Sequence, residues 1–344
     1  MILKKIKHIA KLDFVKNVFT LFTGSALSQV ILYFTIPILT RLFSEEAFGV
    51  YVLYSSVILI SKAVSNLRYE LAILLPTRIK DSVNILALNI FIVTLISALI
   101  AIIIVLFQDS LINLLNIEKI GIFIYFVPLS VFFNGCIVAM NYWNNKMKTF
   151  KNISVGQISK SSSMSAVQIA TGFSAVKYIG LIPGLIVSQF VQMIVMLKLS
   201  IKNFNSYKKF ISFRRMFYLA SKYKDIPRFN TILRFTNILS NELPVLLITK
   251  YFGLAVAGIY GLAVKVSKAP PGIISQSISQ VFFNEASHKY NQGENIYSLI
   301  KKTYKNLLLT AFAIFLPLFG LSFFLGFIFG QDWAEAGIYV RILI

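Results

Sequence analysis

Long apolar segments alternate with short polar connections along the whole chain. An α-helix rises about 1.5 Å per residue, so roughly 20 apolar residues are needed to cross a bilayer core. The segments show no alternation of apolar and polar positions, which argues against the strands of a barrel. The pattern therefore predicts an all-α polytopic membrane protein with spanning helices at residues 14–39, 47–67, 83–107, 120–141, 152–173, 178–199, 231–249, 254–283 and 303–329.

Two stretches of this chain resemble each other. LTRLFSEEAFGVYVL at 39–53 aligns without a gap on ITKYFGLAVAGIYGL at 248–262, with matches that include Gly49 with Gly258 and Tyr51 with Tyr260. Each stretch joins the first and second helices of a six-helix block, and six is even. The repeat therefore predicts two lobes of the same topology, related by an axis along the membrane normal and surrounding a central cavity.

These lobes are expected at 1–200, with helices one to six, and at 231–344, with helices seven to nine and the start of a tenth. A basic, amphipathic, cytoplasmic linker at 201–230 joins them. A tenth helix begins near Ala334, but the sequence stops at Ile344, and this apolar run is too short to cross about 30 Å of hydrocarbon. We therefore expect the sequence to be a fragment whose second lobe is truncated.

Charge placement predicts the orientation of the chain. The composition is 57% hydrophobic and 14% charged, with a net charge of +21. Successive connections carry alternately many and few Lys and Arg residues, 24 on one side and 4 on the other. By the positive-inside rule the N-terminus is cytoplasmic. Basic segments beside membrane helices attract anionic lipid, so the bilayer is the expected partner and nucleic acid is not.

Several classes of chemistry lack the residues that they need. The chain has no P-loop motif, its two histidines lie outside the predicted spans, and Cys136 is its only cysteine. The predicted outer connections are short, and neither catalytic residues nor a metal site can be assigned. We therefore expect a protein that is not an enzyme and has no bound cofactor, with transport driven by a proton or sodium gradient or running downhill.

Charged residues inside the predicted spans are the candidate functional residues. The cations are Lys62, Lys160, Arg234, Lys265 and Lys268, and the single carboxylate is Glu242. Each costs about 2.5–3.5 kcal/mol at the bilayer centre, so the six should face a watery interior. Gln157, Gln168 and Thr171 share a helix face with Lys160 and support that placement.

The excess of cations predicts an anionic substrate group, for which a phosphate or diphosphate is the natural candidate. Glu242 is a candidate for coupling to a proton or cation, and a structural ion pair with a neighbouring helix is the alternative. For Lys265 and Lys268, which precede Pro270 and Pro271, the alternative is snorkelling to the membrane surface.

Several longer motifs resemble Wzx-type lipopolysaccharide O-antigen flippases. They are GSALSQVILYFTIPILTRLFSEEAFGVYVLYSS at 24–56, RYELAILLP at 68–76, YKDIPRF at 223–229, the run at 243–287 and FGQDWAEAGIYVRIL at 329–343. That family belongs to the multidrug, oligosaccharidyl-lipid and polysaccharide exporter (MOP) superfamily, whose members have 12 to 14 helices in two lobes.

The resemblance implies translocation of an undecaprenyl-diphosphate-linked oligosaccharide across a bacterial inner membrane, with a polysaccharide polymerase and a chain-length regulator as candidate partners. The alternatives are a multidrug or cation antiporter of the MATE type, which would want an acidic cavity, and a membrane-embedded polysaccharide polymerase or ligase, which should carry a large outer loop.

Overall fold

The computed structural model describes residues 2–108, 110, 118–174, 179–268, 282, 286 and 297–344. Every regular element within these ranges is helical, which confirms the all-α prediction. The elements are α1 (Ile2–Leu42), α2 (Glu45–Ser65), η1 (Tyr69–Leu74), α3 (Ile79–Leu106), η2 (Glu118–Phe126), α5 (Val127–Lys146), α6 (Phe150–Gly172), α7 (Leu181–Tyr207), η4 (Lys208–Phe210), α8 (Phe213–Lys222), α9 (Asp225–Phe252), a helix over 254–268, α11 (Tyr297–Ser322), α12 (Leu325–Phe329), η5 (Gln331–Trp333) and α13 (Ala336–Leu343).

Six segments within the described ranges are long and apolar enough to cross a membrane. They are Thr20–Leu42, Glu45–Ser65, Ile79–Leu106, Ile120–Lys146, Leu181–Phe210 and Leu299–Ser322. The predicted spans at 152–173 and 231–249 form the helices α6 and α9, which are long enough but too polar to meet the same criterion. The predicted span at 254–283 is described as far as residue 268, and most of its remainder lies outside the described residues. Most of the connection at 108–119 and the connection around Lys177 also lie outside the described residues.

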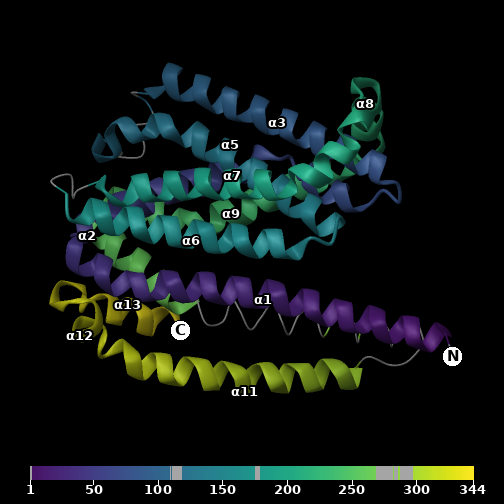
Figure 1. Ribbon diagram of the computed structural model, residues 1–344. Coiled ribbons are helices and arrows are strands. Elements are labelled where there is room, and N and C mark those ends of the chain that lie inside the picture. Colours follow the sequence, from purple (N-terminus) through teal and green to yellow (C-terminus); the bar gives the residue numbers. More distant parts are fainter. Residues whose placement is uncertain are drawn as a thin grey trace.

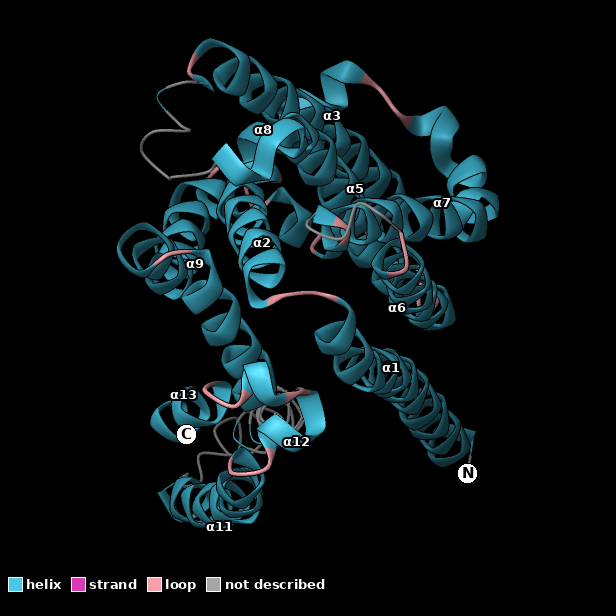
Figure 2. Ribbon diagram, turned by 90° about the vertical axis from the view of Figure 1, so that its left-hand side faces the viewer, coloured by secondary structure: helices cyan, strands magenta, loops and turns pink. Residues whose placement is uncertain are grey.

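The long helices run side by side along one direction (Figure 1). Helix α1 packs along α6, α6 packs on α7, and α5 contacts both α3 and α7. Seen end-on, α2 lies between α5 and α9 (Figure 2), and it packs against both. The N-terminus and α8 lie at one end of the bundle, which we call the N-terminal end. The turn between α1 and α2 lies at the other, the α1–α2 end, together with α12 and α13 (Figure 1).

The two copies of the sequence repeat contact each other directly. A Cβ added at Gly49 on α2 would lie 1.8 Å from the carbonyl oxygen of Leu254, and one at Gly258 would lie 2.0 Å from that of Glu45. Leu254 is the counterpart of Glu45 at the same spacing that relates Gly258 to Gly49. The contact is therefore reciprocal, as at an interface with two-fold symmetry.

An apolar cluster closes the α1–α2 end of the bundle. Trp333 is 1% exposed, its ring lies edge-on to Phe48 at 4.7 Å between centroids, and its indole N–H donates to the carbonyl oxygen of Thr40 at 3.0 Å. The cluster joins α1 and α2 to the helix at 254–268 and to α11, α12 and α13. Helices from both halves of the chain are therefore packed together at this end.

Candidate functional site

Four of the six predicted site residues come together between three helices. The charges of Lys160 on α6 and of Arg234 and Glu242 on α9 all act on the ammonium group of Lys62 on α2. Lys62, Lys160 and Glu242 are half-buried and Arg234 is exposed. The packing of α2 on α9 thus brings residues from the two halves of the sequence into one charged group.

Glu242 is tied to α2 by a short hydrogen bond. The hydroxyl of Ser56 donates to its Oε2 at 2.7 Å. Glu242 forms no salt bridge with any described residue, although its charge acts on the Lys62 ammonium. The carboxylate therefore links the two halves of the chain through a neutral donor, a partner that the sequence did not suggest.

Lys265 and Lys268 lie on the helix at 254–268. The Lys265 ammonium sits 4.7 Å above the ring of Tyr51, a cation–π contact across the interface between α2 and the helix at 254–268. Lys268 is exposed at the end of the described part of that helix. The two remaining cations are thus in different surroundings, one held by an aromatic face and the other open to its environment.

The polar residues expected to accompany Lys160 are used within the first half of the chain. Gln168 is 2% exposed and donates to the carbonyl oxygen of Leu181, while Thr171 donates to that of Gly180. Gln157 accepts from Ser25 on α1. The prediction that this helix face lines a watery interior was wrong for Gln168, which is buried, because helical spacing does not reveal which neighbouring backbone needs a donor. For Thr171, which is half-buried, it stays a prediction.

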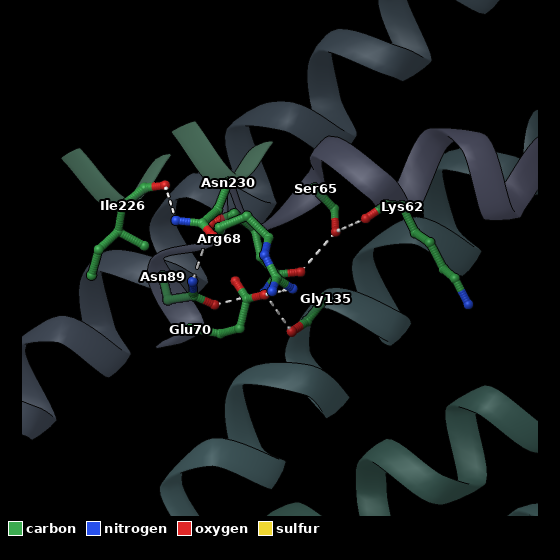
Figure 3. Close-up of polar contacts among 9 residues, drawn as sticks. Lys62, Ser65, Arg68, Glu70, Asn89, Gly135, Ile226 and Asn230 are labelled. Carbon is green, nitrogen blue, oxygen red and sulfur yellow. Dashed lines mark hydrogen bonds and ion pairs between the residues drawn. The ribbon is translucent and has the colours of Figure 1, made fainter. Parts of the chain in front are cut away.

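A second charged pair lies beyond the end of α2, where the sequence had suggested only a connection. Glu70 is 3% exposed, and its Oε1 accepts from the Arg68 guanidinium at 3.0 Å (Figure 3). Leu67 and Arg68 have φ values of 45° and 59°, which non-glycine residues rarely adopt. Burial raises the pKa of the Glu70 carboxyl, and the charges of Arg68 and Arg234 limit that rise.

An amide network holds this strained turn in place. Asn66 donates to the side-chain oxygen of Asn89 at 2.7 Å and to the carbonyl oxygen of Gly135 at 3.0 Å, and it accepts from Ser65. The side chain of Lys62 points away from the network (Figure 3). Asn66 therefore anchors the end of α2 to α3 and α5, and Ser65 supports it.

The pair of Arg68 and Glu70 could have been noticed in the sequence, since a Glu in an otherwise basic connection is unusual here. The geometry of the pair could not be predicted from the sequence, because the left-handed turn at Leu67 and Arg68 depends on the amide network around Asn66. Among the described residues, no group of three or more His, Cys, Asp or Glu side chains could hold a metal ion.

The exposure of α9 differs along its length. Residues 232–237, towards the N-terminal end of the bundle, are exposed, whereas Val245 and Thr249, towards the α1–α2 end, are buried. Tyr251 and Phe252, at the α1–α2 end of α9, are also 71% exposed, so burial of α9 at that end is confined to the face that carries Val245 and Thr249.

Comparisons with known proteins agree with this architecture. A multidrug resistance transporter of the MATE family in the MOP superfamily, solved in an inward-facing conformation, superposes with a TM-score of 0.71 at 14% identity. The match covers 92% of this chain and 76% of that one, so the two share a fold. A search of curated proteins finds no match. The family model described as polysaccharide biosynthesis protein matches residues 38–337, and the chain therefore belongs to that family of multi-pass membrane proteins.

Proposed function

We propose that this protein is a flippase that moves an undecaprenyl-diphosphate-linked oligosaccharide from the cytoplasmic to the periplasmic leaflet of a bacterial inner membrane. Membership of the polysaccharide biosynthesis family and the MOP transporter fold support a membrane transporter in that pathway. The observation that carries the substrate class is the charged group centred on Lys62, on which the charges of two further cations, Lys160 and Arg234, and of one carboxylate, Glu242, act.

In this proposal the three cations hold the diphosphate of the substrate. Arg presents a fork of donors that matches phosphate oxygens, and Lys supplies a compact positive charge. The sugars would cross between the two halves of the chain while the polyprenyl tail stays in lipid. The net positive charge of the group favours an anionic ligand over a cationic one.

The closed α1–α2 end supports a state that opens towards the cytoplasm, if the N-terminus is cytoplasmic as the positive-inside rule predicts. Transport then requires that the contacts of Gly49 and Trp333 separate while the opposite end closes. Such rocking of two lobes about a fixed central site is the expected mechanism of transporters built from repeats.

Glu242 is the candidate for coupling to a proton or sodium gradient, because its carboxylate bridges the two halves of the chain through Ser56. Protonation would remove its charge beside Lys62 and weaken the charge-assisted hydrogen bond. Lys265 and Lys268 would then contact substrate only later in the cycle, and a polysaccharide polymerase and chain-length regulator are the proposed partners downstream.

The second candidate function is multidrug export, which the fold match to a MATE transporter favours. A cationic drug would be repelled by a group with three cations and one carboxylate. The fold alone therefore permits this function, and the charge of the site opposes it.

Complementation of a flippase-null strain tests the proposal. The protein should restore surface polysaccharide and should not export cationic dyes. Lys62→Ala, Lys160→Ala and Arg234→Ala should each weaken substrate binding about tenfold or more, as expected for a lost charge-assisted contact. Lys151→Ala is the matched control, because Lys151 is an exposed cation on the same helix as Lys160.

Two results would contradict the proposal. Dye export without restored polysaccharide would favour the multidrug function instead. Normal complementation by all three variants, at expression equal to that of Lys151→Ala, would leave the flippase but remove the diphosphate site.

A further inference from the structure

Helix α8 joins the two halves of the chain and is firmly docked on the first of them. Met216 and Leu219 are 5% and 1% exposed and pack into an apolar cluster with residues of η1, α3 and α5. The Tyr69 hydroxyl donates to the carbonyl oxygen of Ala220 at 3.1 Å. This side of α8 is thus fully occupied by protein.

The start of α8 is fixed by polar contacts to α3. Asn84 accepts from the backbone N–H of Ser212 at 2.9 Å and donates to the carbonyl oxygen of Phe210 at 2.9 Å. Arg215 makes two hydrogen bonds to Asp81, at 2.8 and 3.0 Å. The orientation of α8 is therefore set by the fold, and Arg215 is neutralised by its partner.

The rest of the α8 surface carries exposed aromatic and basic side chains, and the contacts among them are local: the Arg215 guanidinium lies over the Tyr218 ring at 4.8 Å and the Lys222 ammonium over the Tyr223 ring at 5.4 Å. Phe213 and Phe217 lie one turn apart on one edge and are 71% and 67% exposed, and Tyr218 is 54% exposed. At 100° per residue, Lys222 lies on the edge opposite to Phe213 and Phe217. Arg214 lies on the face between these two edges. Neither Arg214 nor Lys222 forms a salt bridge within the described part of the chain.

Charge and position identify what covers this surface. Residues 208–228 contain seven Lys and Arg against one Asp. Helix α8 lies at the N-terminal end of the bundle and runs across the direction of the long helices (Figure 1), which is the direction of a membrane surface. An aromatic edge beside a cationic edge is the pattern of a helix that lies in the interface of an anionic bilayer.

We propose that α8 is a bilayer-docking element that inserts Phe213 and Phe217 below the lipid headgroups and binds anionic phospholipid headgroups with Arg214 and Lys222. Its partner is the leaflet at the N-terminal end of the bundle. The inference depends on the membrane-spanning fold, and it is independent of which substrate is transported.

Docking on both sides makes α8 a fixed part of the first half of the chain. The junction with α9 is only two residues long, Tyr223 and Lys224. Movement of α9 relative to the first half would therefore bend the chain at that junction, while α8 stays on the bilayer surface.

The depth of α8 can be measured with spin labels on the full chain in lipid nanodiscs. Cys136 is 7% exposed and is replaced by Ala so that it takes no label. Phe217→Cys and Lys222→Cys are labelled in turn, and collision with oxygen or with a water-soluble nickel complex reports the depth of each. The label at position 217 should lie about 5–10 Å into the boundary between headgroups and acyl chains, and the label at 222 should lie at the headgroup level, where the nickel complex reaches it. Equal exposure of both labels to the nickel complex would overturn the proposal.

The preference for anionic lipid is tested separately by the phosphatidylglycerol retained in native mass spectrometry. The variant with Arg214→Gln and Lys222→Gln should bind it more weakly, by about fivefold per charge. Lys148→Gln with Lys151→Gln removes two exposed cations at the α5–α6 connection and is the matched control. Equal loss in both double variants, or no loss in either, would overturn the headgroup assignment. Restoration of surface polysaccharide by the same α8 variants is scored in parallel. Failure of the wild-type protein to restore it would count against the flippase proposal and would leave the lipid-binding result unaffected.

Discussion

Replacing Gly49 by Ala tests whether the two halves of the chain meet at the repeated glycines. The added Cβ would lie 1.8 Å from the carbonyl oxygen of Leu254, whereas carbon and oxygen normally approach to about 3.3 Å. The helices must therefore separate by about 1.5 Å at this point. The obstacle is backbone, so no side-chain rotation can relieve the contact.

The expected cost of Gly49→Ala can be estimated from packing alone. Gly49 has no positive φ, and Ala is the better helix former by about 1 kcal/mol, so local propensity favours the substitution. Overpacking of a tight interface costs about 1–3 kcal/mol, or more where backbone obstructs. We expect a net loss of stability of up to about 2 kcal/mol, seen as a fall of a few degrees in Tm of the detergent-purified protein.

Two variants provide the comparison for Gly49→Ala. A Cβ at Gly320 on α11 meets nothing within 4 Å, so Gly320→Ala should leave Tm unchanged or raise it. Gly258→Ala should resemble Gly49→Ala, and the double variant should cost less than the sum because both changes separate the same two helices. A Tm for Gly49→Ala no lower than that for Gly320→Ala would refute the contact, and strict additivity would refute the shared interface.

Three further substitutions probe single contacts. Trp333→Phe keeps the aromatic packing but loses the hydrogen bond to the α1 carbonyl, and it should lower stability by about 1–3 kcal/mol in chemical unfolding; an unchanged midpoint would argue against that bond. Arg68→Ala should cost about 3–5 kcal/mol, because it leaves Glu70 buried without its cation. The pKa of Glu70 is already raised, so its native form binds the proton more tightly; stability of the variant should fall as pH rises above the ordinary carboxyl range, and Glu70→Gln should abolish that slope. Ser56→Ala should reduce transport more than it reduces Tm if Glu242 couples the two halves, and equal effects would mark a purely structural bond.

The repeat was the most informative feature of the sequence. Matching Gly49 with Gly258 predicted two equivalent helix turns, and the structure places the two glycines at one reciprocal contact. The sequence could not show that the copies pack against each other. An alignment relates positions along the chain, whereas a contact depends on how the two halves are rotated in space.

Charge placement selected four residues that the structure places in one charged group. Lys62, Lys160, Arg234 and Glu242 were selected because isolated charges in apolar spans need a polar environment, and the last three all act on Lys62. Their role in binding substrate stays a prediction. Lys265 satisfied the same criterion but lies on the Tyr51 ring. The cost of burial says that a charge needs a partner, and it does not say whether that partner is another charge, a hydroxyl or an aromatic face.

The sequence by itself determined that this protein lies in a lipid bilayer and that its regular structure is helical. Apolar segments of bilayer length leave helices as the stable form, because every backbone group in lipid must be hydrogen-bonded within its own segment. The bias of Lys and Arg then predicts an orientation.

Only the tertiary structure decided which polar residues serve packing and which remain available for a substrate. Gln168 and Asn66 have the same chemistry as residues that line a transport path. Each instead donates a hydrogen bond to a nearby backbone carbonyl oxygen, that of Leu181 and that of Gly135. Their roles depend on which atoms lie within about 3 Å, and that proximity is created by helices distant in sequence. Strain at Leu67 and Arg68 has the same origin, since the left-handed turn persists only because surrounding side chains hold it.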